Sequence, residues 1–235
     1  MPLYVKDWDI VVPGEILAEG EYAAGPYVYK EGNKLYSMTV GIVEHKKGVI
    51  RVVPLQGPYI PKVGDVVIGI VVDYSPTAYV IDINSSYKAI LQAVEVIPPR
   101  KNVLTEDLAK YLEIGEALVC KVAKFDKYSD VILTCKGKDL GKISDGRLIK
   151  ISPAKIPRLI GRKGSMVNLI KRETGCKIVI GQNGYIWIKG KDSKLEALAE
   201  KAIRKIEQEA HMSGLTQRIQ DMLQVEKGSL SLIHI

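Results

Sequence analysis

A short segment of this chain combines two glycines and two cations at a spacing suited to gripping phosphates. The segment is Ile160-Gly161-Arg162-Lys163-Gly164, a Gly-x-x-Gly tetrad that opens a predicted helix. Because glycine has no Cβ, the main chain can approach a phosphate closely. The free N–H groups and positive dipole end of the helix point the same way, and Arg162 and Lys163 add two charges. The tetrad therefore predicts a nucleic-acid backbone clamp, which supplies affinity rather than sequence reading.

The tetrad lies in a strongly basic part of the chain. Between Arg147 and Arg172 there are eight basic side chains and no acidic one, so Arg158, Lys171 and Arg172 are further candidate phosphate contacts. Residues 146–235 hold seventeen Lys or Arg against eight Asp or Glu, whereas the preceding residues are nearly neutral. A basic surplus can also be a solvated helix face, but the acid-free run around the tetrad favours nucleic-acid binding.

The elements around the tetrad distinguish it from a plain turn between helices. A short strand at residues 148–151 precedes a helical turn at Ile156 to Ile160, and a second helix with an apolar face ends at Gly175. Residues 176–190 alternate as two strands joined by a turn at residues 182–184. A long amphipathic helix begins at Ser193.

This order resembles the eukaryotic-type KH domain over about residues 146 to 210. The resemblance implies an α+β domain in which Gly161, Arg162, Lys163 and Gly164 clamp about four nucleotides of single-stranded RNA. It also implies that Ile160 forms the apolar floor of the groove that holds the bases. Core packing is the alternative for Ile160.

Residues 61–145 are predicted to be all-β. Two extended runs flank residues 74–77, and two later strands cover Ala117 to Phe125 and Asp130 to Cys135. Between them lies a polar connector with a short helix at Thr105 to Leu112, capped by Thr105 and ended at Gly115. Five strands with a helical connector fit a small OB-type barrel.

Three phrases of this segment, Val63-Gly64-Asp65, Thr77-Ala78-Tyr79-Val80 and Val131-Ile132-Leu133-Thr134, resemble the S1-type RNA-binding domain. The resemblance implies that Tyr79 stacks on bases, and packing in the core is the alternative. Possible phosphate contacts here, or else solvated surface charges, are Lys88, Arg100, Lys121 and Lys124.

Residues 1–60 are rich in predicted strands with Gly and Pro between them and carry no excess charge. This β module is a candidate protein docking surface, with core formation as the default role. The longest apolar runs of the chain have the length of strands, so no membrane span is predicted. Three separated cysteines without metal-ligand spacing indicate an intracellular, cytoplasmic setting and no metal or cofactor.

The three modules in this order resemble the Rrp-four family, the RNA-binding cap subunits of the archaeal exosome. The resemblance implies that three copies sit on a hexameric ring of RNase-PH-like subunits and that the N-terminal module holds the ring. Single-stranded RNA would be captured near the tetrad and guided to phosphorolytic 3′-to-5′ sites in other subunits.

Catalysis by the chain itself is not predicted, because its acids are scattered rather than clustered. Polynucleotide phosphorylase carries similar KH and S1-type modules, but after two large catalytic domains for which this chain has no room. The alternative function is a free-standing RNA-binding regulator of translation or RNA stability. The KH domain with its long C-terminal helix is predicted over residues 146–228. The tail 229–235 is predicted to continue neither a helix nor a strand; it has no assigned role, and an artificial extension is one interpretation.

Overall fold

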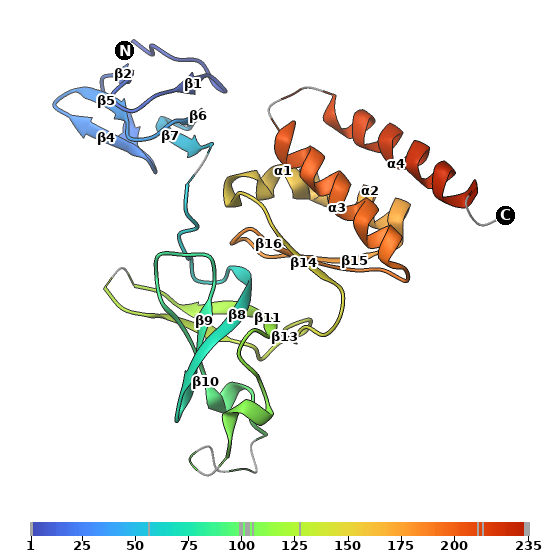
Figure 1. The fold of residues 1–235 in the computed structure, drawn as a ribbon. Coiled ribbons are helices and arrows are strands. Elements are labelled where there is room, and N and C mark those ends of the chain that lie inside the picture. Colours follow the sequence, from blue (N-terminus) through green and yellow to red (C-terminus); the bar gives the residue numbers. More distant parts are fainter. Residues whose placement is uncertain are drawn as a thin grey trace. The chain divides into compact units, whose positions relative to one another are not determined.

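The chain forms two compact units, Met1–Gly57 and Pro58–Ile235, each with its own core. The computed structural model (Figure 1) describes residues 2–55, 57–98, 101, 104, 106–126, 128–210, 212 and 214–232. Of residues 228–232 it describes the backbone alone.

The N-terminal unit consists of two small sheets, with strand orders β1-β6-β7-β3 and β2-β5-β4. Alternation along the strands buries Val11, Leu17 and Val43 completely. The prediction of a β module is confirmed. Its strands are β1 (Ile10–Val11), β2 (Ile16–Glu19), β3 (Ala23–Ala24), β4 (Val28–Glu31), β5 (Lys34–Ser37), β6 (Gly41–Lys46) and β7 (Val49–Pro54).

The second unit begins with the predicted barrel. Strands β8, β9, β10, β12 and β11 pair in a closed ring, because β11 bonds to both β12 and β8, and β13 is added beside β11. The alternate residues that face inward, such as Val67, Leu91 and Leu133, form a core of their own. The strands are β8 (Val66–Ser75), β9 (Ala78–Asp82), β10 (Ala89–Gln92), β11 (Ala117–Lys124), β12 (Val131–Thr134) and β13 (Gly141–Lys142).

The connector between β10 and β11 differs from the expected helix. In place of an α-helix, its described residues include the 3₁₀ turns η1 (Ala93–Glu95) and η3 (Leu108–Lys110). Asp107 caps η3, since its side chain accepts a hydrogen bond from the Ala109 N–H. The expected cap Thr105 lies outside the described residues.

The KH part has the predicted order of elements and is a three-stranded antiparallel sheet, β14-β16-β15, with helices on one face. Its elements are β14 (Arg147–Lys150), η4 (Pro153–Lys155), α1 (Ile156–Ile160), η5 (Arg162–Gly164), α2 (Ser165–Thr174), β15 (Lys177–Ile180), β16 (Tyr185–Lys189), α3 (Ser193–Gln208) and α4 (Leu215–Leu232). Gly175 ends α2 in the left-handed conformation, with its N–H bonded to the Lys171 carbonyl.

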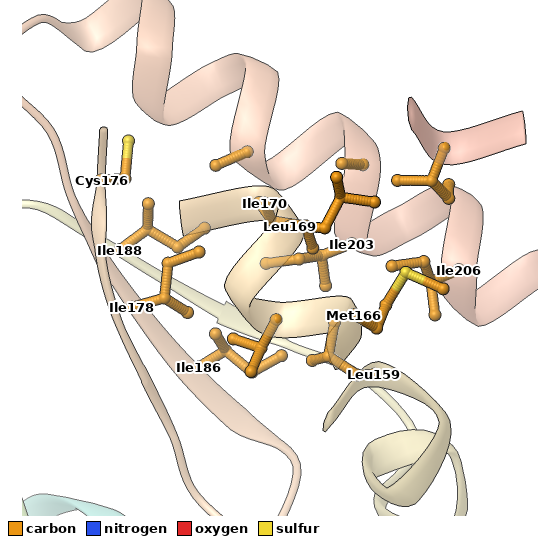
Figure 2. Close-up of a cluster of buried hydrophobic side chains, with 14 of the residues drawn as sticks. Leu159, Met166, Leu169, Ile170, Cys176, Ile178, Ile186, Ile188, Ile203 and Ile206 are labelled. Carbon is orange, nitrogen blue, oxygen red and sulfur yellow. The ribbon is translucent and has the colours of Figure 1, made fainter. Parts of the chain in front are cut away.

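Figure 2 shows the core between this sheet and the helices, where Met166 and Ile170 of α2 meet Ile178 and Ile186 of the strands. Ile203 of α3 closes it from the helix side. This core fixes the start of α2, and with it the glycine tetrad, against the sheet.

The C-terminal end differs from the expectation. A separate helix, α4, follows α3 and buries Leu215, Ile219 and Leu223 in the KH core. It continues to Leu232, so part of the predicted tail is helical. The physical reason is that the sequence after Val225 contains no proline to end the helix.

The turn between β15 and β16 joins the KH part to the barrel. On the side of β8 that faces β9, the backbone of Ile68 has no strand partner, because β9 ends at Asp82. The buried side chain of Asn183 forms the hydrogen bonds there instead. Its amide nitrogen donates to the carbonyls of Ile68 (2.7 Å) and Ile83 (2.9 Å), and its oxygen accepts from the Ile68 N–H (3.3 Å). Gln182 pairs in the same way with Val66. The barrel and the KH sheet therefore form one unit.

Candidate nucleic-acid interface

The tetrad forms a tight turn between α1 and α2 that requires glycine at its first position. Gly161 has φ 73° and ψ 177°, a conformation nearly restricted to glycine. A Cβ there would lie 2.9 Å from the Met166 nitrogen and 2.9 Å from Ser165 Oγ. Gly164 is left-handed at φ 79°. A Cβ added at Gly164 would lie 3.4 Å from the nearest neighbouring atom. Lys163 is also left-handed, and both cations of the tetrad are exposed.

The start of α2 is open to an anion. Gly164 occupies the N-cap position, where it has no side chain to accept from the first N–H groups of the helix. The first turn of α2 holds no acidic residue. The dipole of the helix and the cations Arg162 and Lys163 therefore act on the same point.

Gly161→Ala is expected to destabilise the chain by about 2 kcal/mol, because it combines a glycine-only conformation with a close backbone contact. Gly164→Ala is the matched control, since only the left-handed conformation opposes its methyl group. It is expected to cost about 1 kcal/mol. Urea unfolding measures both, and equal effects would contradict the assigned geometry.

The other predicted cations of the KH part do not all join the tetrad. Arg158 lies on α1 and donates to the Met212 carbonyl at 3.1 Å, so it is already bonded to the α3–α4 connection. Lys171 and Arg172 lie near the opposite end of α2, about 10 Å along the helix axis from Gly164. Arg172 bonds Glu173 at 3.0 Å. Of these predicted cations, Arg162 and Lys163 directly precede the open start of α2.

Ile160 is half-buried and packs against the KH core, as does Ile180 at the end of β15. Both alternatives for Ile160 remain compatible with this position, because one side of the residue is covered and the other is accessible. Its role as a groove floor stays a prediction.

The barrel presents its predicted lysines on the outside. Cross-strand pairing places Val80, Ile90, Ile132 and Lys124 in one outward row over four strands, with the three apolar members half-buried. Exposed lysines of the barrel surface are Lys88, Lys121 and Lys124. Arg100 lies outside the described residues.

Tyr79 is not on this surface. Its ring is completely buried in the barrel core, and its hydroxyl donates to the Leu108 carbonyl at 2.8 Å. Burial raises the pKa of Tyr79 to about 12. A ring without exposed area cannot stack on a base, so the stacking prediction for Tyr79 is wrong and the packing alternative holds.

Sequence reasoning missed two other tyrosines of the barrel that are exposed. Tyr74, near the β8–β9 turn, is 40% exposed, and Tyr128, in the loop between β11 and β12, is 96% exposed. Their positions next to turns were the available signal.

Among the described residues, no three His, Cys, Asp or Glu side chains gather closely enough to hold a metal ion. None of the helices in the described ranges is long and apolar enough to cross a membrane.

Models of three domain families match the chain in succession. The first is the exosome RNA binding protein RRP4 N-terminal domain, at residues 8–56. The S1 domain of exosome complex component RRP40 matches residues 59–145, and the KH domain matches residues 146–194.

Curated relatives match along nearly the whole chain. "Exosome complex component Rrp4" of Thermococcus kodakarensis is 43% identical over 94% of this chain and 87% of the relative. The protein of the same name from Methanothermus fervidus is 45% identical over 94% of this chain and 97% of its own length. This chain belongs to the Rrp4 family.

A solved structure also supports the Rrp4 assignment. A crystal structure described as a putative exosome complex RNA-binding protein shares 39% sequence identity with this chain, with a TM-score of 0.68. The match covers 73% of this chain and 98% of the other. The glycine tetrad and the barrel of this Rrp4-family chain thus belong to two domain types, KH and S1-type, that bind single-stranded RNA in other proteins.

Proposed function

We propose that this chain is the non-catalytic RNA-binding cap subunit of an archaeal exosome. The observation that carries the proposal is the open start of α2 directly after Arg162 and Lys163, in a chain of the Rrp4 family. RNA phosphates bind there, while the nuclease chemistry takes place in other subunits.

The division of labour in this proposal follows the sequence modules 1–60, 61–145 and 146–228. The basic excess of the chain lies in its last module, where RNA is first captured. The barrel lysines then contact the backbone of the strand as it is guided toward the ring. Because Asn183 fixes the barrel to the KH sheet, the two contact regions keep a constant separation.

The proposed partner of the N-terminal module is a hexameric ring of RNase-PH-like subunits that carries three copies of this chain. Support comes from exposed apolar side chains on and beside β1: Trp8 is 71% exposed, Ile10 64% and Val12 53%. Cross-strand pairing places Ile42 of β6 and Val53 of β7 in one row with Ile10, on the side of the sheet opposite to the core. Surfaces of this kind mark protein interfaces. The cytoplasm is the proposed location, in keeping with three free cysteines.

Trp8→Ala is expected to weaken binding to the ring about thirtyfold, because a large aromatic side chain loses its burial in the interface. Val49→Ala is the control: this valine is also exposed, at 39%, but lies on β7 next to β3 rather than near β1. Light scattering of mixtures with a purified ring measures the affinity. A wild-type chain that stays unbound yet holds RNA would favour the free-standing regulator instead.

A further inference from the structure

Tyr128 is the most exposed large apolar side chain among the described residues. It lies in the loop between β11 and β12, and 96% of its surface is accessible. A tyrosine in that position buries almost no apolar area, so it contributes little to the stability of the barrel. Its ring is available to a ligand, unlike the ring of Tyr79.

Described residues next to Tyr128 make local hydrogen bonds and a ring contact. The Asp126 carboxylate accepts a hydrogen bond from the Tyr128 N–H at 3.2 Å, and the Ser129 N–H bonds the Asp126 carbonyl at 3.3 Å. Before the turn, Phe125 packs edge-on against Tyr87 with ring centroids 4.8 Å apart. The backbone at Tyr128 and Ser129 is therefore tied to Asp126.

Two of the predicted phosphate contacts lie at the same end of the barrel. Lys124 is the last residue of β11, and the carbonyl of Lys88 accepts from the Val131 N–H at the start of β12. The same end carries the contact with the KH turn, where Asn84 Nδ2 donates to the Asn183 carbonyl at 2.7 Å. The exposed ring of Tyr128 is thus carried by a loop at the same end of the barrel as two exposed lysines and the contact with the KH turn.

We propose that Tyr128 is a base-stacking residue for single-stranded RNA and that Lys88 and Lys124 contact the phosphates beside the stacked base. The inference rests on the proposed function, since it requires that the chain binds RNA. OB-type domains hold single strands in this way, with aromatic rings as platforms and cations along the backbone. Every base has a flat face, so this contact tolerates any sequence.

Charges near the ring indicate how the contact differs from the clamp. In the sequence from Lys124 to Asp130 the acids Asp126 and Asp130 balance the two lysines, Lys124 and Lys127. Stacking therefore contributes most of the attraction at this point, and removal of the ring leaves the ion release on binding almost unchanged. This separates the role of Tyr128 from that of Arg162 and Lys163.

The test compares Tyr128→Ala and Tyr128→Phe in the full chain, with a 20-nucleotide uridine-rich RNA as the probe. Tyr128→Ala is expected to bind about tenfold more weakly, with the salt dependence of the wild type. Tyr128→Phe keeps the ring and is expected to bind like the wild type. Tyr74→Ala, at the opposite end of β8, is the control for loss of an exposed tyrosine. In the wild type, 4-thiouridine in the probe is expected to crosslink to the peptide that contains Tyr128.

Three outcomes would overturn the inference. If the wild type and Tyr128→Ala bind RNA equally, the stacking contact is wrong while the clamp stands. If Tyr128→Ala binds RNA normally but no longer joins the ring, Tyr128 is a protein contact. If the wild type binds no RNA, both this inference and the proposed function fail.

Discussion

Replacing Arg162 and Lys163 together by alanine is expected to weaken binding of single-stranded RNA about a hundredfold at low salt. Each cation stands beside the open start of α2, where it can make a charge-assisted bond to a phosphate. Two such bonds are worth about 3 kcal/mol in total, which corresponds to roughly this factor. The loss is expected to be similar for all RNA sequences, because phosphates carry no sequence information.

The salt dependence of binding tests this result most sharply. Each lost phosphate contact lowers the slope of log affinity against log salt by about 0.7 for a single strand, so the double variant is expected to lose about 1.4. The control is Lys191→Ala with Lys194→Ala, which changes the net charge equally at exposed positions around the start of α3. An unchanged slope in the Arg162/Lys163 variant would contradict the clamp.

Asn183→Ala is expected to lower the free energy of unfolding of the second unit by about 3 kcal/mol. The substitution leaves the Ile68 N–H and the carbonyls of Ile68 and Ile83 without their present partner. Each buried group that loses its hydrogen bond costs about 1 kcal/mol or more. The variant also weakens the contact between the barrel and the KH sheet, so the two parts are expected to unfold less cooperatively.

Gln182→Ala is the matched control in the same turn. It removes a single hydrogen bond, which the Val66 N–H donates to the exposed side chain of Gln182. It is expected to cost about 1 kcal/mol. Urea unfolding followed by the fluorescence of Trp187, which packs in the apolar cluster at the junction, measures both variants. Equal effects of the two substitutions would show that Asn183 does not hold the domains together.

The KH elements were predictable because each carries a local signal. The glycine tetrad, the apolar face of α2 and the cap at Gly175 identify the helices from neighbouring residues alone. The turn at residues 182–184 was equally visible as a local pattern. Its function was not, because the groups that Asn183 bonds are more than a hundred residues away in the barrel, except for Ile83 at a separation of 100.

The burial of Tyr79 shows why a strand pattern does not always reveal its inner face. In Ala78-Tyr79-Val80-Ile81-Asp82, both alternating sets of side chains contain apolar residues. Tyr79 and Ile81 turn inward, whereas Val80 is half-buried on the outside. Only the closure of the barrel decides between the two faces.

Helix α4 was missed for a different reason. The spacing of Leu215, Ile219 and Leu223 is helical, but the helix is only partly amphipathic. These three residues pack on the KH core. Tertiary packing therefore stabilises a segment whose own pattern is weak.

The most direct test of the central claim is the rate at which a purified RNase-PH-like ring degrades a single-stranded RNA in phosphate, with and without this chain. We expect that the chain alone degrades nothing, that it accelerates the ring, and that the Arg162→Ala/Lys163→Ala variant joins the ring but loses most of the acceleration. Degradation by the chain alone, or equal acceleration by the wild type and the variant, would contradict the proposed function.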